Sequence, residues 1–234
     1  CCPLLPGGKA CAGKGAPASL PAPAREELAG HIVFVSDRDD PSGEIYTMRA
    51  DGSQITRVTR NQLAEAYPSV SRDGTQVVFA ASSGGIYTLN LAACAGQPGG
   101  CGPESLRKVL DYGQHPEWSP DGGRILFSAD DAYVMNADGS GVVALRLAPA
   151  TPGLAKEATW GPDGRSVAAV AMQMVTNLYI TRFDANGRET GATWLARDGY
   201  EPAVAPDGAT VALTSSDRCL CLVPADGTRA PRRL

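Results

Sequence analysis

The chain has 234 residues, of which 43% are hydrophobic, with 27 Gly, 18 Pro and a formal net charge of −4. This composition excludes a disordered protein, because disordered segments lack the apolar residues that build a core. The basic residues are scattered, which disfavours nucleic acid as a partner and leaves no polybasic patch for a membrane surface. No apolar run approaches the roughly 20 residues that a membrane-spanning helix requires.

Residues 1–30 differ in composition from the rest of the chain. They begin with Cys1-Cys2 instead of Met, are rich in Gly, Ala and Pro, and contain no aromatic and no β-branched residue. Such a segment cannot build a core and is typical of an extended, flexible tether. Mature bacterial lipoproteins begin in this way, so we expect lipid on Cys1, an extracytoplasmic, periplasmic location and anchoring to the membrane by the N-terminal lipid. The alternative is a chain boundary that falls at a Cys by chance.

The seven cysteines favour an oxidising compartment, because lipidation of Cys1 would leave six for pairing. Cys94 and Cys101 flank the turn-forming stretch AGQPGG, which favours a local disulfide between them. Cys219 and Cys221 are two residues apart in a predicted strand, too far apart for easy bridging. One of this pair could instead bond to a cysteine of the tether, and the sequence leaves the connectivity open between Cys2 and Cys11.

From residue 31 to residue 234 an Asp-Gly turn followed by an apolar run recurs along the chain. The turns begin at Asp73, Asp121, Asp163 and Asp207, with spacings of 48, 42 and 44 residues. Each Gly is followed three residues later by an apolar run such as Val77-Val78-Phe79, and Ile32-Val33-Phe34 is a further copy without the upstream turn. A period of about 45 residues is typical of the blades of a β-propeller.

Each repeat reads as a small antiparallel sheet. A second strand, usually containing Tyr, follows each apolar run, and another Asp-Gly or Asn-Gly hairpin signal follows in most repeats. We therefore predict an all-β propeller of about five four-stranded blades over residues 31–234, in which the first blade, 31–60, lacks its innermost strand. The Cys94–Cys101 loop is then an insertion in the second blade. A β-sandwich is the alternative, although sandwiches do not require such a period.

Three stretches of the repeat carry a family resemblance. Trp118-Ser119-Pro120-Asp121-Gly122, the stretch 36–46 and the stretch 135–140 resemble the repeat of TolB-like β-propellers, over nearly all of the chain outside the tether. The resemblance implies the propeller fold. It is less specific for function, because the family includes proteins that bind partners in the cell envelope, lids of peptidases and some polysaccharide lyases. The chain has fewer repeats than the six or seven usual in that family, so we consider a five-bladed ring, an open arc and a ring completed by the tether or a partner.

The sequence contains no convincing catalytic, metal or cofactor motif. His31 and His115 are the only histidines, which makes a catalytic triad or a multi-histidine metal site hard to assemble. The stretch 8–14 matches the spacing of a phosphate-binding loop but lacks the required strand, helix and Ser or Thr. The acidic residues at 37–44 suit turn capping better than calcium binding. Trp118 and Trp160 are expected to pack between blades.

The residues that open the innermost strands are the candidate binding site. The innermost strands of the last four blades begin near equivalent positions, each followed by Pro or Ala, at Tyr67, His115, Glu157 and Glu201. If these strands line the axis, the four side chains meet at one mouth of the channel, where they could bind a peptide or a small ligand; the alternative is solvated strand ends. The favoured function is a non-catalytic propeller that binds envelope or membrane proteins, for example as an accessory subunit of a membrane complex. The second is a ligand-binding or hydrolytic propeller that acts at this rim.

Overall fold

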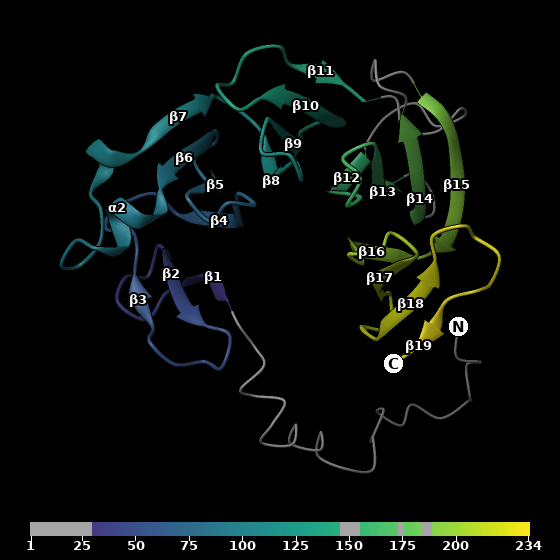
Figure 1. Cartoon of the computed structure of the whole chain (residues 1–234), viewed down its shortest axis with the longest axis horizontal. Helices are drawn as coiled ribbons and strands as arrows, with labels where there is room; N and C mark the ends of the chain where they lie inside the picture. Colours follow the sequence, from purple (N-terminus) through teal and green to yellow (C-terminus); the bar gives the residue numbers. More distant parts are fainter. Residues whose placement is uncertain (1–29, 146–154, 173–175, 184–188) are drawn as a thin grey trace.

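The fold is a β-propeller of five sheets arranged side by side around a common centre (Figure 1). The computed structural model describes residues 30–145, 155–172, 176–183 and 189–234. Each sheet is antiparallel, and its strands follow one another in chain order from the centre outward. The predicted propeller is therefore confirmed and the β-sandwich is excluded.

The first blade contains three strands instead of four, as predicted. Its strands are β1 (His31–Ser36), β2 (Glu44–Arg49) and β3 (Thr56–Arg57). In the register of the repeat, β1 corresponds to the second strand of the other blades, because Phe34 pairs with Tyr46 as Phe79 pairs with Tyr87. The innermost strand is the missing one.

The other four blades each have four strands. The second blade consists of β4 (Glu65–Val70), β5 (Gln76–Ala81), β6 (Ile86–Asn90) and β7 (Arg107–Leu110). The third consists of β8 (Gln114–Trp118), β9 (Arg124–Ser128), β10 (Ala132–Asn136) and β11 (Val143–Ala144). The fourth consists of β12 (Ala155–Trp160), β13 (Ser166–Met172), β14 (Thr176–Phe183) and β15 (Glu189–Arg197). The fifth consists of β16 (Gly199–Val204), β17 (Thr210–Ser215), β18 (Leu220–Pro224) and β19 (Arg232–Arg233).

The core is divided into hydrophobic clusters that lie at the junctions between consecutive blades. One cluster contains Ile45 of the first blade and Phe79 of the second, and three similar clusters follow at the next three junctions. Trp118 and Trp160 are buried in two of them, as expected. A thin antiparallel sheet cannot bury both of its faces alone, so each blade is stabilised by its neighbours.

The insertion in the second blade fastens that blade to the first. It contains the short helix α2 (Leu91–Ala95) and the 3₁₀ turn η1 (Pro103–Ser105), and a disulfide joins Cys94 to Cys101, as the sequence analysis anticipated. The Cys101 N–H donates to the Val58 carbonyl at 2.8 Å, and the Arg60 N–H donates to the Cys101 carbonyl at 2.7 Å. The insertion therefore continues the outer edge of the first blade. Within the described residues, no helix has the length and hydropathy needed to cross a membrane.

Candidate functional site

The four predicted rim residues occupy equivalent and unusual positions in the innermost strands, which surround the centre of the propeller (Figure 1). At each of them the pairing with the next strand shifts register, which is the mark of a β-bulge. The φ angles are +54°, +50°, +54° and +47° at Tyr67, His115, Glu157 and Glu201. Residues with a side chain rarely adopt this left-handed conformation, and such strain is concentrated at functional sites.

The structure brings the rim residues together in two pairs. The rings of Tyr67 and His115 lie against each other with centroids 3.8 Å apart, and Tyr67 is 49% exposed. On the following blades, Glu157 Oε2 accepts a hydrogen bond from the backbone N–H of Glu201 at 2.9 Å. Glu201 Oε2 in turn accepts from the Thr214 hydroxyl at 3.2 Å. Each pair therefore links two consecutive blades.

The rim comprises an aromatic pair on the second and third blades and two carboxylates on the fourth and fifth, side chains suited to polar and aromatic recognition. The Tyr67–His115 pair presents ring surface and a phenolic hydroxyl, and the exposed Glu201 adds negative charge. Across the residues that the structure describes, no group of three or more His, Cys, Asp or Glu side chains is placed to hold a metal ion. The arrangement can therefore bind a ligand or a partner through these side chains.

Two buried glutamates between the first and second blades were not singled out as a pair by the sequence analysis. Glu65 Oε2 accepts from the Thr59 hydroxyl at 2.6 Å and the Ile45 N–H at 2.9 Å, and its Oε1 accepts from Asn61 Nδ2 at 2.7 Å. Glu44 is fully buried and its Oε1 accepts from Arg57 Nη2 at 2.9 Å. The sequence placed Glu44 among the turn-capping acids, and only the crossing of residues 57–65 between blades buries it.

Burial controls the ionisation of Glu65. Desolvation raises the pKa of Glu65 to about 7, against the opposing effect of the hydrogen bonds from Thr59 and Asn61, which favour the charged form. The neighbouring Glu44 carboxylate adds to the increase in the pKa of Glu65. Desolvation likewise raises the pKa of Glu117 to about 7, although Glu117 accepts hydrogen bonds from the Trp160 N–H and the Thr159 hydroxyl. These carboxyls accept hydrogen bonds from the neighbouring blade and therefore connect consecutive blades.

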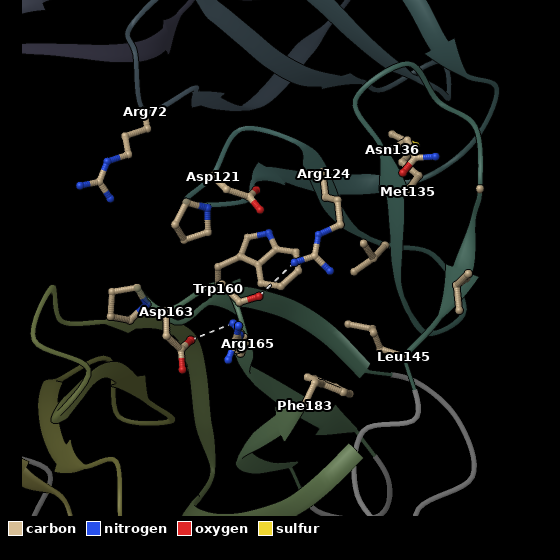
Figure 2. Close-up of a pocket in the computed structure, with 16 residues that line it drawn as sticks. Arg72, Asp121, Arg124, Met135, Asn136, Leu145, Trp160, Asp163, Arg165 and Phe183 are labelled. Atoms are coloured by element: carbon tan, nitrogen blue, oxygen red, sulfur yellow. Dashed lines mark hydrogen bonds between the residues drawn. The ribbon is translucent and has the colours of Figure 1, made fainter. Parts of the chain in front are cut away.

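A pocket of about 660 Å³ between the third and fourth blades is a second candidate site (Figure 2). It lies beside the Pro-Asp-Gly turns of these blades, and Arg124 Cζ stands 5.1 Å from the centroid of the Trp160 ring. Arg124 Nη2 also donates to the Gly164 carbonyl at 3.1 Å, so this arginine connects the two blades. Figure 2 shows Leu145 and Phe183 on the apolar side of the pocket.

The charged side chains of the pocket differ in how far they are already engaged in hydrogen bonds. A hydrogen bond from the Ser119 hydroxyl at 2.5 Å lowers the pKa of Asp121, which therefore stays ionised and engaged within its own turn. Arg72 and Arg165 also line the pocket. Guanidinium groups beside an apolar wall suit a ligand with an acidic group and an apolar part. This pocket could not be predicted from the sequence, because its residues meet only through the packing of three blades.

Part of the sequence-based site lies beyond the residues that the structure describes. Cys1, Cys2 and Cys11, which carry the lipidation and tether-pairing predictions, lie outside the described ranges. Cys219 is half-buried and Cys221 is buried in the cluster between the fourth and fifth blades. The pairing of either cysteine with Cys2 or Cys11 remains a prediction.

The comparisons with known proteins agree with the propeller fold. No family model matches the chain. It is 27% identical over 153 residues to a TolB homolog of Chlorobium luteolum, an alignment that covers 63% of this chain but only 33% of the relative. The crystal structure of TolB from Acinetobacter baumannii superposes with a TM-score of 0.67 and 21% identity, covering 84% of this chain and 49% of that protein.

A second solved structure with the same fold is that of a protein named as an enzyme. The oligogalacturonate lyase of Vibrio parahaemolyticus superposes with a TM-score of 0.51 and 12% identity, covering 90% of this chain and 75% of that protein. Identities this low establish the fold and not the activity. The repeat sequence, the blade architecture and these likenesses agree on the fold, which is that of a β-propeller similar to TolB.

Proposed function

We propose that this protein is a non-catalytic, extracytoplasmic propeller that binds proteins of the cell envelope and is held at a membrane by lipid on Cys1. The observation that carries the proposal is the rim, where four equivalent residues are held in a costly backbone conformation and the exposed ring of Tyr67 lies against the half-buried ring of His115. The likeness to TolB supports an envelope role. The proposed tether of thirty residues, treated as a random coil, would have an r.m.s. reach of about 30 Å, which is enough to hold the propeller beside a membrane partner.

The test is a pull-down from the native membrane in mild detergent with wild-type protein and rim variants. A stoichiometric partner that is retained by wild type and lost by Tyr67→Ala and His115→Ala is the expected result. The matched control is Tyr112→Ala, which removes another exposed aromatic that is not a rim residue. Equal capture by wild type and both rim variants would contradict the role of the rim, and an unmodified Cys1 in mass spectrometry of the native protein would contradict the lipid anchor.

The alternative is a propeller that binds or hydrolyses a ligand at the same rim. It is favoured by the presence of an imidazole and two carboxylates at equivalent positions of neighbouring blades, and the fold likeness to a lyase is compatible with it. The double variant His115→Ala/Glu157→Ala is expected to abolish such binding while leaving the circular dichroism spectrum unchanged. Undiminished ligand binding by the folded double variant would eliminate this alternative.

A further inference from the structure

The pocket between the third and fourth blades lies at the opposite end of the innermost strands from the rim. His115 is the second residue of β8 and Glu157 the third of β12, whereas the Pro-Asp-Gly turns that border the pocket follow the last residues of these strands. Among the residues that the structure describes, the lining of the pocket includes none of the four rim residues. A ligand of this pocket would therefore occupy a second site, separate from the rim.

Arg124, the first residue of β9, is held in a defined position at the pocket (Figure 2). Its guanidinium carbon lies 5.1 Å from the centroid of the Trp160 ring, and its Nη2 donates to the Gly164 carbonyl at 3.1 Å. A guanidinium has five N–H donors in a planar fork, so this hydrogen bond leaves most of them available. Because the half-buried side chain is already ordered by the fourth blade, it would lose little conformational entropy on binding an anion.

The guanidinium groups of the pocket are not paired with its carboxylates. In the part of the chain that the structure describes, no ion pair involves the three arginines of the lining, Arg72, Arg124 and Arg165. The two aspartates of the lining accept hydrogen bonds within their own turns, Asp121 from the Ser119 hydroxyl and Asp163 from the Ser166 hydroxyl. Asp121 still lies near enough to Arg124 for a favourable charge interaction. The lining has an excess of one positive charge, which a monovalent anion would neutralise.

One side of the pocket is apolar. It includes Val143 and Leu145 at the outer edge of the third blade and Phe183 at the end of β14. Val143 is 61% exposed, so an apolar group placed in the pocket would remove apolar surface from water. Figure 2 shows Leu145 and Phe183 on the other side of Arg124 from Asp121. The volume of about 660 Å³ lies in the range of sites that hold small organic ligands.

We propose that this pocket binds a small carboxylic acid that carries an apolar arm. The carboxylate pairs with the Arg124 guanidinium, because the planar fork of an arginine matches the two oxygens of a carboxylate. The arm packs on Val143, Leu145 and Phe183. A monovalent acid fits better than a phosphate dianion, because the lining has an excess of only one positive charge and its two aspartates repel further negative charge. This site goes beyond the protein-binding function proposed for the rim and does not rest on it.

The test is isothermal titration calorimetry of the full chain with two acids, octanoate with an aliphatic arm and phenylacetate with an aromatic one. At least one of them is expected to bind, and the corresponding neutral amide should bind at least tenfold more weakly because it has no charge to pair with Arg124. Arg124→Met, which removes the charge and keeps a long side chain, should weaken binding of the acid at least tenfold. The matched control is Arg229→Met, which removes an exposed arginine of the fifth blade and should leave binding unchanged.

A second variant keeps the test decisive if Arg124→Met disturbs the junction between the blades. Val143→Asp places a negative charge at an exposed position on the apolar side of the pocket, so it should also weaken binding at least tenfold. Circular dichroism verifies that each variant folds. The bound acid is also expected to raise the Tm of the wild-type protein, because it binds only the folded state.

Three results would overturn the proposal: neither acid binds at millimolar concentration, acid and amide bind equally, or binding is unchanged in a folded variant of Arg124 or Val143. Tyr67→Ala at the rim should leave binding of the acid unchanged. Loss of binding in that variant would place the acid at the rim and would also overturn the proposal. The pull-down with rim variants tests the proposed function separately, so failure of the pocket leaves that function intact.

Discussion

At the scale of single residues, the rim shows how tertiary packing imposes a conformation that the side chains do not favour. The rim residues Tyr67, His115, Glu157 and Glu201 comprise one Tyr, one His and two Glu, yet all of them adopt φ near +50°. The bulge is therefore a property of the repeat, and it turns a side chain out of the strand at the same place in each blade.

Glu201→Gly is expected to raise the free energy of unfolding by up to about 1 kcal/mol. The left-handed conformation costs an L-residue about 1–2 kcal/mol, which outweighs the backbone entropy of glycine. The control is Ala203→Gly, at an exposed position of the same strand that lies outside the positive-φ region and should lose about 0.5–1 kcal/mol. Urea denaturation measures both, and equal losses for the two variants would contradict the strain at position 201.

The buried carboxyl of Glu65 is expected to make stability depend on pH. The pKa of Glu65 is about 7 in the folded protein against an ordinary value of 4.5, so the folded state binds the proton more tightly. Its contribution is complete below about pH 4.5 and is lost as the pH rises through 7, by at most about 3 kcal/mol.

Urea denaturation of wild-type protein at pH 5 and pH 7.5 should therefore show lower stability at the higher pH. Glu65→Gln, which imitates the neutral acid, should remove about half of this loss, and Glu65→Gln/Glu117→Gln should remove most of it, because the pKa of Glu117 is also about 7. Glu157→Gln at the rim is the control variant. A wild-type protein that is equally stable at both pH values would show that ionisation of Glu65 and Glu117 does not destabilise the folded state.

At the scale of elements, the insertion of the second blade has a structural role that extends to its neighbour. Cys94 and Cys101 are buried in the cluster that joins the first two blades, and the backbone of Cys101 bonds to the residues that follow β3. This contact compensates for the incomplete first blade, whose β3 has only two residues.

Removing the disulfide should therefore loosen the first blade as well as the second. The variant Cys94→Ala/Cys101→Ala is expected to lose roughly 2–3 kcal/mol of stability, mainly through the increased freedom of the unfolded chain. Hydrogen exchange should accelerate at the amides of Arg60 and Cys101, which bond across the two blades. Unchanged exchange at these amides would show that the hydrogen bonds keep the insertion on the outer edge of the first blade without the disulfide.

At the scale of the whole molecule, the blades form a linear series in which each depends on its neighbours. Among the described residues, each end blade packs on one neighbouring blade, whereas the third blade is covered on both faces. Stability is therefore expected to be highest in the middle of the series and lowest at its ends.

Truncation of equivalent residues measures this gradient. Ile125→Ala in the third blade removes a completely buried side chain and is expected to cost about 2–5 kcal/mol. Ile32→Ala, at the equivalent position of the first blade, is expected to cost less than about 1.5 kcal/mol because the side chain is already half in water. If the two variants lost the same free energy of unfolding in urea denaturation, the Ile32 side chain would be buried in solution.

The sequence by itself determined the fold and the number of blades, because Asp-Gly turns and apolar runs are local signals that repeat with a fixed period. It also placed the rim residues in equivalent strands and paired Cys94 with Cys101, since these relations follow from register and from short chain separation. Only the tertiary structure decided that Glu44 and Glu65 are buried and that Ile32 and Leu220 are not. Burial depends on what stands beside a blade, and residues with the same place in the repeat differ when one of them has no neighbouring sheet.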